Sequence, residues 1–147
     1  MNIKTFLSPA DVLLDVRARD KVAVLDELSS RAAAVLNLSA ELIAHEIERR
    51  EELGSTGIGG GVSMPHARFR EVKKPFGLLA RLKQPVNFDA IDGQPVDLVF
   101  LLLLPASSQL DQLNTLAAVA RKLRDPKVLK DLRGATTASE LYKAVAA

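Results

Sequence analysis

The sequence contains no cysteine. This absence excludes disulfide bonds, thiolate zinc sites and a cysteine nucleophile, and it fits a reducing compartment, so we expect a cytoplasmic location. Long hydrophobic runs are also missing, since none approaches the roughly 20 residues that span a bilayer. The N-terminal stretch MNIKTFLSPADVLLD lacks the apolar core of a signal peptide. We therefore expect a soluble protein with no membrane insertion.

An excess of charge of one sign is missing as well. The chain has 20 Lys and Arg against 18 Asp and Glu, distributed throughout its length, and this balance does not indicate nucleic-acid binding. The basic residues of the C-terminal third are diluted by Asp125 and Asp131 and lack aromatic neighbours, which favours a solvated face over a docking surface. They are Arg121, Lys122, Arg124, Lys127, Lys130 and Arg133.

Internal repeats and low-complexity linkers are absent from the 147 residues, of which 48% are hydrophobic. A chain of this size can bury a substantial core as one unit. We therefore expect a single domain over residues 1–147.

Apolar residues at helical spacing predict several amphipathic helices. Ser39 is an N-cap candidate, and Thr137 with Glu140 forms a capping-box pattern for the last helix. The earlier helices are expected over residues 20–36, 39–52, about 113–123 and 125–132. Their expected inward residues are Leu25, Leu28, Ala32 and Val35 in the first, Ala40, Ile43, Ala44 and Ile47 in the second, and Leu113, Leu116, Ala117, Ala120 and Leu123 in the third.

Two short apolar runs bounded by Pro and Gly predict strands at residues 77–82 and 95–105. The second is continuous enough to be buried on both faces of a sheet. Residues 86–94 between them fit a connection or an edge hairpin. Helices interleaved with strands indicate an α/β or α+β fold around a small sheet, with the strand order left open.

Five glycines, a proline and one of the two histidines crowd into GSTGIGGGVSMPHAR, residues 54–68. The stretch follows a predicted helix and lacks a Gly-Lys-Ser/Thr ending, so it matches neither nucleotide-binding template. Its glycines allow main-chain N–H groups to converge on an anion beside His66. Pro65 stiffens the chain and holds His66 at the end of a short extended segment. The alternative is a tight turn whose histidine caps a neighbouring group.

Arg50 continues the inward stripe of Ile43 and Ile47 on the second predicted helix. A guanidinium fork suits phosphate geometry and stays charged near neutral pH. The alternative is a snorkelling arginine that pairs with a local glutamate such as Glu46. Arg49 is expected on the solvated face.

Gln112 stands at the inner edge of the third long helix, in line with Leu116, Val119 and Leu123. There it can donate an N–H into a site, although a surface glutamine is the alternative. His45 lies among glutamates and is expected to be a partly exposed structural residue. Two histidines without matching carboxylate spacing make a poor metal site.

Ser55 and Ser63 also lie near His66 in the sequence. No strand–elbow–helix motif surrounds either serine, so they do not form a recognisable hydrolase arrangement with that histidine.

Three stretches together carry a family resemblance: RREELGSTGIGGGVSMPHAR, VNFDAIDGQPVDLVFLLLLP and QLNTLAAVARKLRDPKVLKDLRGATTASELYKAV. They resemble the fructose/mannitol class of phosphotransferase-system enzyme IIA, most closely its nitrogen-regulatory branch. The resemblance covers nearly the whole chain. It implies an α/β (α+β) fold of the IIA type-2 domain, in which a small mixed central sheet is flanked by helices.

The resemblance also implies a site and partners. His66 matches the histidine that accepts a phosphoryl group, and Arg50 matches the active-site arginine. Thr56 and the amides of Gly59, Gly60 and Gly61 are then expected to bind the phosphoryl oxygens, without metal or cofactor. The implied donor is the phosphohistidine carrier HPr or its nitrogen-branch paralogue (NPr).

One residue departs from the family pattern, because Gln112 stands where a second active-site histidine is usual. Glutamine can donate a hydrogen bond to phosphate but cannot become a cation, so we expect altered transfer rate, phosphohistidine lifetime or pH dependence. Three functions remain open at this point. They are a phosphocarrier that regulates partner proteins by its phosphorylation state, a sugar-uptake component that passes phosphate to a IIB domain, and an interaction module without transfer.

Overall fold

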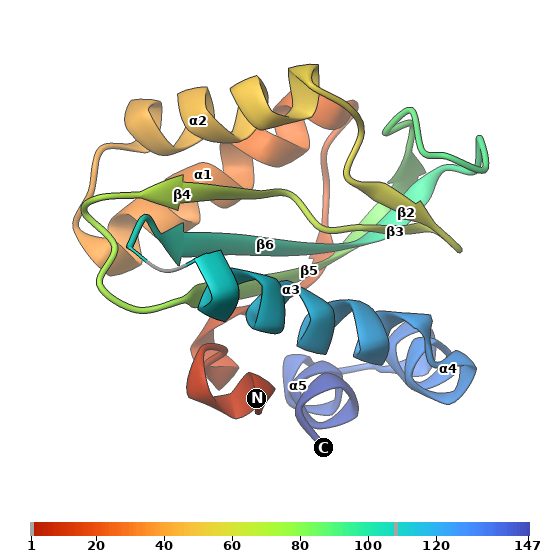
Figure 1. The fold of residues 1–147 in the computed structure, drawn as a ribbon. Coiled ribbons are helices and arrows are strands. Elements are labelled where there is room, and N and C mark those ends of the chain that lie inside the picture. Colours follow the sequence, from red (N-terminus) through yellow and green to blue (C-terminus); the bar gives the residue numbers. More distant parts are fainter. Residues whose placement is uncertain (1, 108) are drawn as a thin grey trace.

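In the computed structural model, which describes residues 2–107 and 109–147, a six-stranded mixed β-sheet separates two layers of helices (Figure 1). The strands are β1 (Val12–Val16), β2 (Gly57–Gly59), β3 (Val62–Ser63), β4 (His66–Phe69), β5 (Phe76–Val86) and β6 (Val96–Pro105). The helices are α1 (Lys21–Leu36), α2 (Ala40–Glu52), α3 (Gln109–Arg124), α4 (Pro126–Gly134) and α5 (Ala138–Ala146), with 3₁₀ turns η1 (Ile3–Thr5) and η2 (Pro9–Asp11). The expected mixed sheet flanked by helices is confirmed.

The sheet has the strand order β1-β5-β6-β3-β2. β5 and β6 are antiparallel and β1 is parallel to β5, whereas β3 and β4 are both parallel to β6. β5 follows one edge of β6, so β3 and β4 lie one after the other along its opposite edge. Met64 and Pro65 separate the two paired stretches, and residue pairing resumes at His66, opposite Leu102. A proline has no N–H to donate and is suited to such an interruption.

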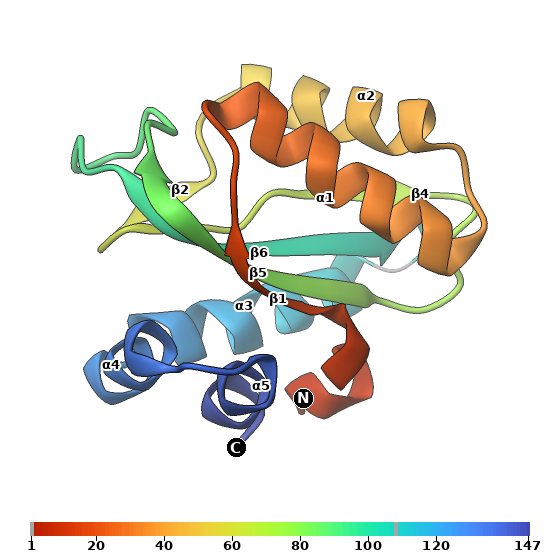
Figure 2. The same cartoon turned by 180° about the vertical axis from the view of Figure 1, so that it is seen from behind.

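The two helical layers pack against alternate residues of β6 because successive side chains of a strand point to opposite faces. Val99, Leu101 and Leu103 pack with α1 and α2, whereas Leu98, Phe100, Leu102 and Leu104 pack with α3, α4 and α5. All seven are at most 1% exposed. Seen from behind, α1 and α2 again cover one face of the sheet and the C-terminal helices the other, with both termini on the latter side (Figure 2).

The predicted helices are all present, and their caps follow the sequence. The side chain of Ser39 accepts a hydrogen bond from the backbone N–H of Leu42, and that of Thr137 accepts one from Glu140. Asp20 and Asp125 cap α1 and α4 in the same way. Each cap satisfies a donor that the first helical turn leaves free.

Some inward residues were predicted wrongly. Val35 is 55% exposed, because the stripe of α1 continues from Ala32 to Leu36 instead. Leu113 is 63% exposed and Ala117 is also exposed. The buried line of α3 consists of Gln112, Thr115, Val119 and Leu123.

Candidate functional site

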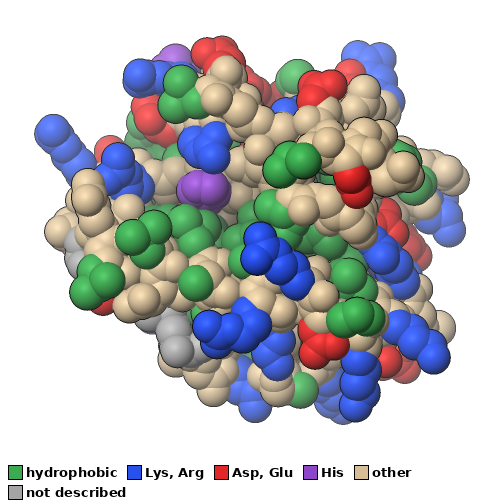
Figure 3. Space-filling model, turned by 45° about the vertical axis from the view of Figure 1, so that its right-hand side comes forward, with side chains coloured by type: hydrophobic (Ala, Val, Ile, Leu, Met, Phe, Trp, Pro, Cys, Tyr) green, Lys and Arg blue, Asp and Glu red, His purple; other side chains and the backbone are tan. Residues whose placement is uncertain are grey.

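His66 opens β4 and lies at the wall of an open cavity of about 780 Å³. Figure 3 shows a histidine in a hollow of the surface, with Lys or Arg side chains beside it and hydrophobic side chains along the other rim. The cavity lies where β4 and the end of β6 meet the last turn of α2 and the first turns of α3. Its lining residues are Glu46, Arg49, Arg50, Glu52, Leu53, His66, Ala67, Arg68, Arg70, Leu104, Ala106, Gln112, Leu113 and Leu116.

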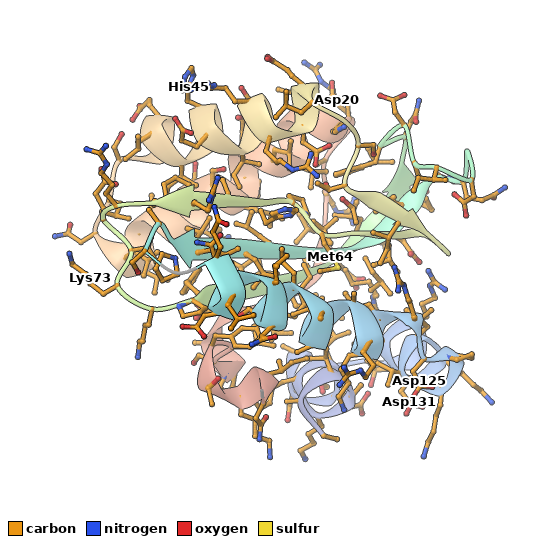
Figure 4. All side chains as sticks on the ribbon, in the orientation of Figure 1. Asp20, His45, Met64, Lys73, Asp125 and Asp131 are labelled. Carbon is orange, nitrogen blue, oxygen red and sulfur yellow. The ribbon has the colours of Figure 1, made fainter. Side chains whose placement is uncertain are left out.

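The His66 imidazole is oriented by a main-chain carbonyl. Its Nδ1 lies 2.8 Å from the Met64 carbonyl oxygen, and a carbonyl can only accept, so Nδ1 carries the hydrogen. In the neutral ring Nε2 then holds the free lone pair. Met64 is labelled in Figure 4, where it lies between the sheet and α3. Its carbonyl is available because the β3–β6 pairing ends at Ser63.

The pKa of His66 is lowered from its ordinary value. Burial is the main cause, and the nearby Arg50 charge acts in the same direction, whereas the Met64 hydrogen bond and the Glu51 charge oppose it. A lowered pKa keeps the ring neutral near pH 7. The site therefore presents an unprotonated Nε2 beside a permanent cation.

Arg50 belongs to the last turn of α2, and its side chain is half-buried at the cavity. One guanidinium nitrogen, Nη1, donates to the Gly54 carbonyl at 2.9 Å. Glu46, the alternative partner of Arg50, pairs with Arg49 instead, because its Oε1 lies 3.9 Å from Arg49 Nη1. Arg50 is thus tethered by the loop that follows its helix, and its fork remains at the cavity wall.

Gln112 reaches the same cavity from the first turns of α3. It is 8% exposed, so it is not the surface glutamine of the alternative interpretation. Its Nε2 donates to the Pro105 carbonyl at 2.7 Å. Because an amide nitrogen carries two hydrogens, this bond leaves the second N–H for another acceptor. The structure therefore brings His66, Arg50 and Gln112 together.

The structure does not bring the glycine turn to His66, which corrects that expectation. Gly59 ends β2, Gly60 and Gly61 form the turn to β3, and all three have positive φ. Val62 pairs with Leu98 and His66 with Leu102, four residues apart along β6, or about 13 Å. None of the three glycines is among the residues that line the cavity.

The glycine turn nevertheless holds an anion, the carboxylate of Asp92 in the β5–β6 connection. Asp92 accepts from the Gly60 N–H at 3.0 Å. Hydrogen bonds from the N–H groups of Gln94 and Gly60 lower the pKa of Asp92. The glycine amide thus serves an internal acceptor instead of a phosphoryl group.

Thr56 is also turned away from the cavity, contrary to the expectation. Its hydroxyl is buried, donates to Glu51, and lies 3.1 Å from the Ser63 hydroxyl. The sequence interpretation gave Glu51 no role, although it directly follows Arg50.

Arg68 and Arg70 are two basic cavity residues to which the sequence analysis gave no role. Residues two apart in a strand share a face, so the position of Arg68 in β4 was a signal for its place beside His66. Arg70 follows the end of that strand.

The remaining candidates lie outside the site. His45 is exposed on the outer side of α2, away from the sheet (Figure 4). Ser55 donates to the Phe88 carbonyl at 2.6 Å. In residues 2–107 and 109–147, no three His, Asp or Glu side chains gather as a metal site would require. Within the same residues, no helix has the length and apolar character to cross a membrane.

Sequence comparisons connect this chain to a family. The profile described as "Phosphoenolpyruvate-dependent sugar phosphotransferase system, EIIA 2" matches residues 5–147. The nitrogen regulatory protein of Bradyrhizobium diazoefficiens is 39% identical over 99% of this chain and 95% of its own length. That of Escherichia coli K12 is 40% identical over 88% of this chain and 80% of its own length.

Solved structures agree with these relatives. The crystal structure of nitrogen regulatory protein IIA-Ntr from Neisseria meningitidis superposes with a TM-score of 0.92 at 32% identity, covering 97% of this chain and 98% of that one. IIA mannitol from Escherichia coli, at 17% identity and a TM-score of 0.80 over 95% and 98% of the chains, shares the fold. The chain therefore belongs to the EIIA 2 family of the phosphoenolpyruvate-dependent phosphotransferase system, in its nitrogen-regulatory branch.

Proposed function

We propose that residues 1–147 act as one EIIA domain in which His66 accepts a phosphoryl group from an HPr-like phosphocarrier of the nitrogen branch. Membership of the family makes the chain a phosphocarrier; the accepting residue, the donor and the acceptors are the proposal. The observation that carries it is the Nδ1–H bond of His66 to the Met64 carbonyl, which leaves Nε2 as the nucleophile at an arginine-lined cavity.

The transfer step uses groups already in place. The Nε2 lone pair of His66 attacks phosphorus as the donor's phosphorus–nitrogen bond breaks, and the donor imidazole leaves with that electron pair. A phosphorus–nitrogen bond forms at Nε2, so the group keeps its transfer potential. Such reactions need in-line positioning and stabilisation of the equatorial oxygens more than acid–base catalysis. Arg50 supplies a fixed positive charge for those oxygens.

Gln112 takes the role of a neutral donor to the phosphoryl group. Its carboxamide is anchored by Pro105, so the second Nε2 hydrogen is the one available to an oxygen in the cavity. A glutamine remains neutral at every physiological pH. Its contribution to the phosphorylated state is therefore independent of pH.

The rim of the cavity suits a protein partner. Leu53 is 85% exposed, Leu110 68% and Leu113 63%, and exposed apolar groups of this kind mark interaction surfaces when they gather. Leu53 and Leu113 line the cavity together with Arg49 and Arg68. An apolar rim with cations around a nucleophile fits the docking of a donor and then of an acceptor, either a regulated protein or a IIB domain.

The test is intact-protein mass after incubation with phosphoenolpyruvate, enzyme I and the HPr-like carrier. Wild type is expected to gain one acid-labile phosphoryl group, and His66→Ala to gain none. The matched control is His45→Ala, which removes the exposed histidine of the chain and should label like wild type.

Two results would contradict the proposal. One is label that remains in His66→Ala. The other is no label on wild type from a donor shown to be charged, which would support an interaction module without transfer. Rapid exchange with a fructose- or mannitol-type IIB would instead favour a role in sugar uptake.

A further inference from the structure

An ion pair with little exposure lies between the helical layer and the segment that leads to His66. Lys21, the first residue of α1, places its Nζ 2.6 Å from Oε2 of Glu51 in the last turn of α2. The Glu51 side chain is 6% exposed and that of Lys21 is 20% exposed. Taking two charges out of water costs free energy that their attraction repays only with further hydrogen bonds. The pair must therefore be examined together with its other partners.

Those partners fix both ends of the pair. Lys21 Nζ also donates to the Phe88 carbonyl at 3.3 Å and lies 5.5 Å from the centroid of the Phe88 ring. Glu51 accepts from Thr56 twice, through the backbone N–H at 3.3 Å and through the hydroxyl. The carboxylate thereby holds the Thr56 peptide in place relative to α2.

A hydrogen-bond chain continues from Thr56 to the imidazole. The Thr56 carbonyl accepts from the Met64 N–H at 3.0 Å. The Met64 carbonyl in turn lies 2.8 Å from His66 Nδ1. The links Lys21–Glu51–Thr56–Met64–His66 thus form one continuous series from the start of α1 to the reacting ring.

We propose that Glu51, held by Lys21, is a positioning residue for phosphoryl transfer: through Thr56 and the Met64 carbonyl it fixes the tautomer and orientation of the His66 ring. This inference rests on the proposed role of His66 as the phosphoryl acceptor. Arg50 and Glu51 are neighbours on α2, yet Arg50 lines the cavity while Glu51 binds Thr56, so the last turn of α2 contributes to the site in two ways.

A displaced carbonyl has a definite chemical consequence. Without an acceptor at Nδ1, the hydrogen redistributes between the two ring nitrogens, and Nε2 loses its lone pair in part of the molecules. Misplacement of a reacting group by about 1 Å can cost about a hundredfold in rate. Tautomer and transfer rate should therefore change together.

The test uses protein labelled with ¹⁵N in histidine, whose imidazole nitrogen shifts report the tautomer directly. The chain has only two histidines, so exposed His45 serves as an internal reference. Thr56→Val, which keeps the shape but removes the hydroxyl, is expected to reduce the Nδ1–H tautomer of His66 and to slow phosphorylation about tenfold. Thr56→Ser should restore both, and Thr136→Val should change neither, since the Thr136 hydroxyl donates to Glu140, which belongs neither to the cavity nor to the Lys21–Glu51 series.

A second pair of variants separates positioning from folding and charge. Lys21→Met/Glu51→Gln and Lys21→Met/Glu51→Leu both remove the buried charges, but only the first keeps an acceptor for Thr56. We expect the Gln variant to retain the wild-type tautomer and rate within about threefold, and the Leu variant to lose both while remaining folded by thermal melting, because apolar replacements of buried ion pairs are tolerated.

Equal tautomers and equal rates in the Gln and Leu variants would overturn the positioning role, as would a wild-type tautomer in Thr56→Val. The tautomer is measured without any phosphoryl donor. A wild-type protein that takes no phosphoryl group therefore refutes the proposed function, and the control of the His66 tautomer is then judged from the nitrogen shifts; unchanged nitrogen shifts refute this inference alone.

Discussion

Two arginines that contact the segment 54–68 behave in opposite ways. At the glycine turn, Arg133 donates to both carboxylate oxygens of Asp97, at 3.0 and 2.9 Å, and to the Gly60 carbonyl at 2.5 Å. At the cavity, Arg50 makes one hydrogen bond among the described residues, to Gly54. A guanidinium has five N–H donors. Arg133 uses three of these donors to join α4 to the sheet, whereas Arg50 uses one and keeps the others available for an anion.

The largest expected effect is a slower phosphoryl transfer when the cavity arginine is replaced. Arg50→Ala should slow phosphorylation of His66 by about a hundredfold or more, because one preorganised donor to developing charge is typically worth 10²–10³ in rate. Arg50→Lys keeps the charge without the fork and should recover part of that loss. The measurement is the rate of transfer from charged HPr-like carrier by quench and intact mass.

The matched control for that experiment is Arg121→Ala, an exposed arginine on α3 that does not line the cavity. Its transfer rate should equal that of wild type. If the transfer rate of Arg50→Ala lay within threefold of wild type, a group other than Arg50 would have to stabilise the phosphoryl oxygens.

A smaller effect is expected at the glycine turn, in stability instead of transfer. Gly61 has φ +78°, and a Cβ there would lie 2.6 Å from Arg133 Nη2 and 3.0 Å from Asp97 Oδ1. Gly61→Ala should lower the free energy of unfolding by about 2–3 kcal/mol through strain and the displaced ion pair. Denaturant unfolding measures this loss, and phosphorylation of His66 should be unchanged in folded protein.

Gly60→Ala is the control for Gly61→Ala in the same turn. Gly60 has φ +68°, but a Cβ there would meet no described atom within 4 Å. Only the left-handed backbone should then cost free energy, about 1–2 kcal/mol. If Gly61→Ala slowed transfer tenfold without loss of stability, the turn would belong to the site after all.

The smallest expected effect concerns the pH dependence of phosphoryl transfer to His66. The pKa of His66 lies below its ordinary value of 6.5 because of burial and Arg50. Protonation, which removes the Nε2 lone pair, therefore sets in only as pH falls through that lowered pKa. The transfer rate should be flat around pH 7 and decline at pH values below 6.5. Gln112→His adds a second titrating group and should change the profile or the phosphohistidine lifetime a few-fold between pH 5 and 8.

An NMR titration of His66, with His45 as reference, separates the pH response of this chain from that of its donor. An inflection above 6.5 for His66, or identical profiles for wild type and Gln112→His, would contradict the respective expectation.

Helices and strands with a strong hydrophobic pattern were predicted from the sequence, and those with a weak pattern were not. β6 and the helices have long apolar runs or clear helical periods with caps, and all were predicted. β1, β2, β3 and β4 were not predicted, because strands of two to five residues carry too few side chains to show a period. Their pairing depends on contacts with distant residues.

The site divides in the same way. His66 was predicted from the glycine-rich segment, Arg50 and Gln112 from helical stripes, and all three from the family resemblance; the structure brings them to one cavity. The glycine amide was expected to bind an anion and does so, but the anion is Asp92, a residue 32 positions beyond Gly60 in the chain. The local sequence shows that a glycine turn can bind an anion, whereas the fold determines which anion reaches the turn.

The interruption at Pro65 has a mechanical consequence. His66 is anchored to Leu102, whose side chain is 0% exposed in the middle of the sheet, and the Pro65 carbonyl accepts from the Leu102 N–H at 2.9 Å. These contacts with the buried strand leave the backbone at His66 little room to shift when a phosphoryl group is added. We therefore expect a partner to distinguish the two states by the added negative charge of about 1.5–2 on an unchanged shape.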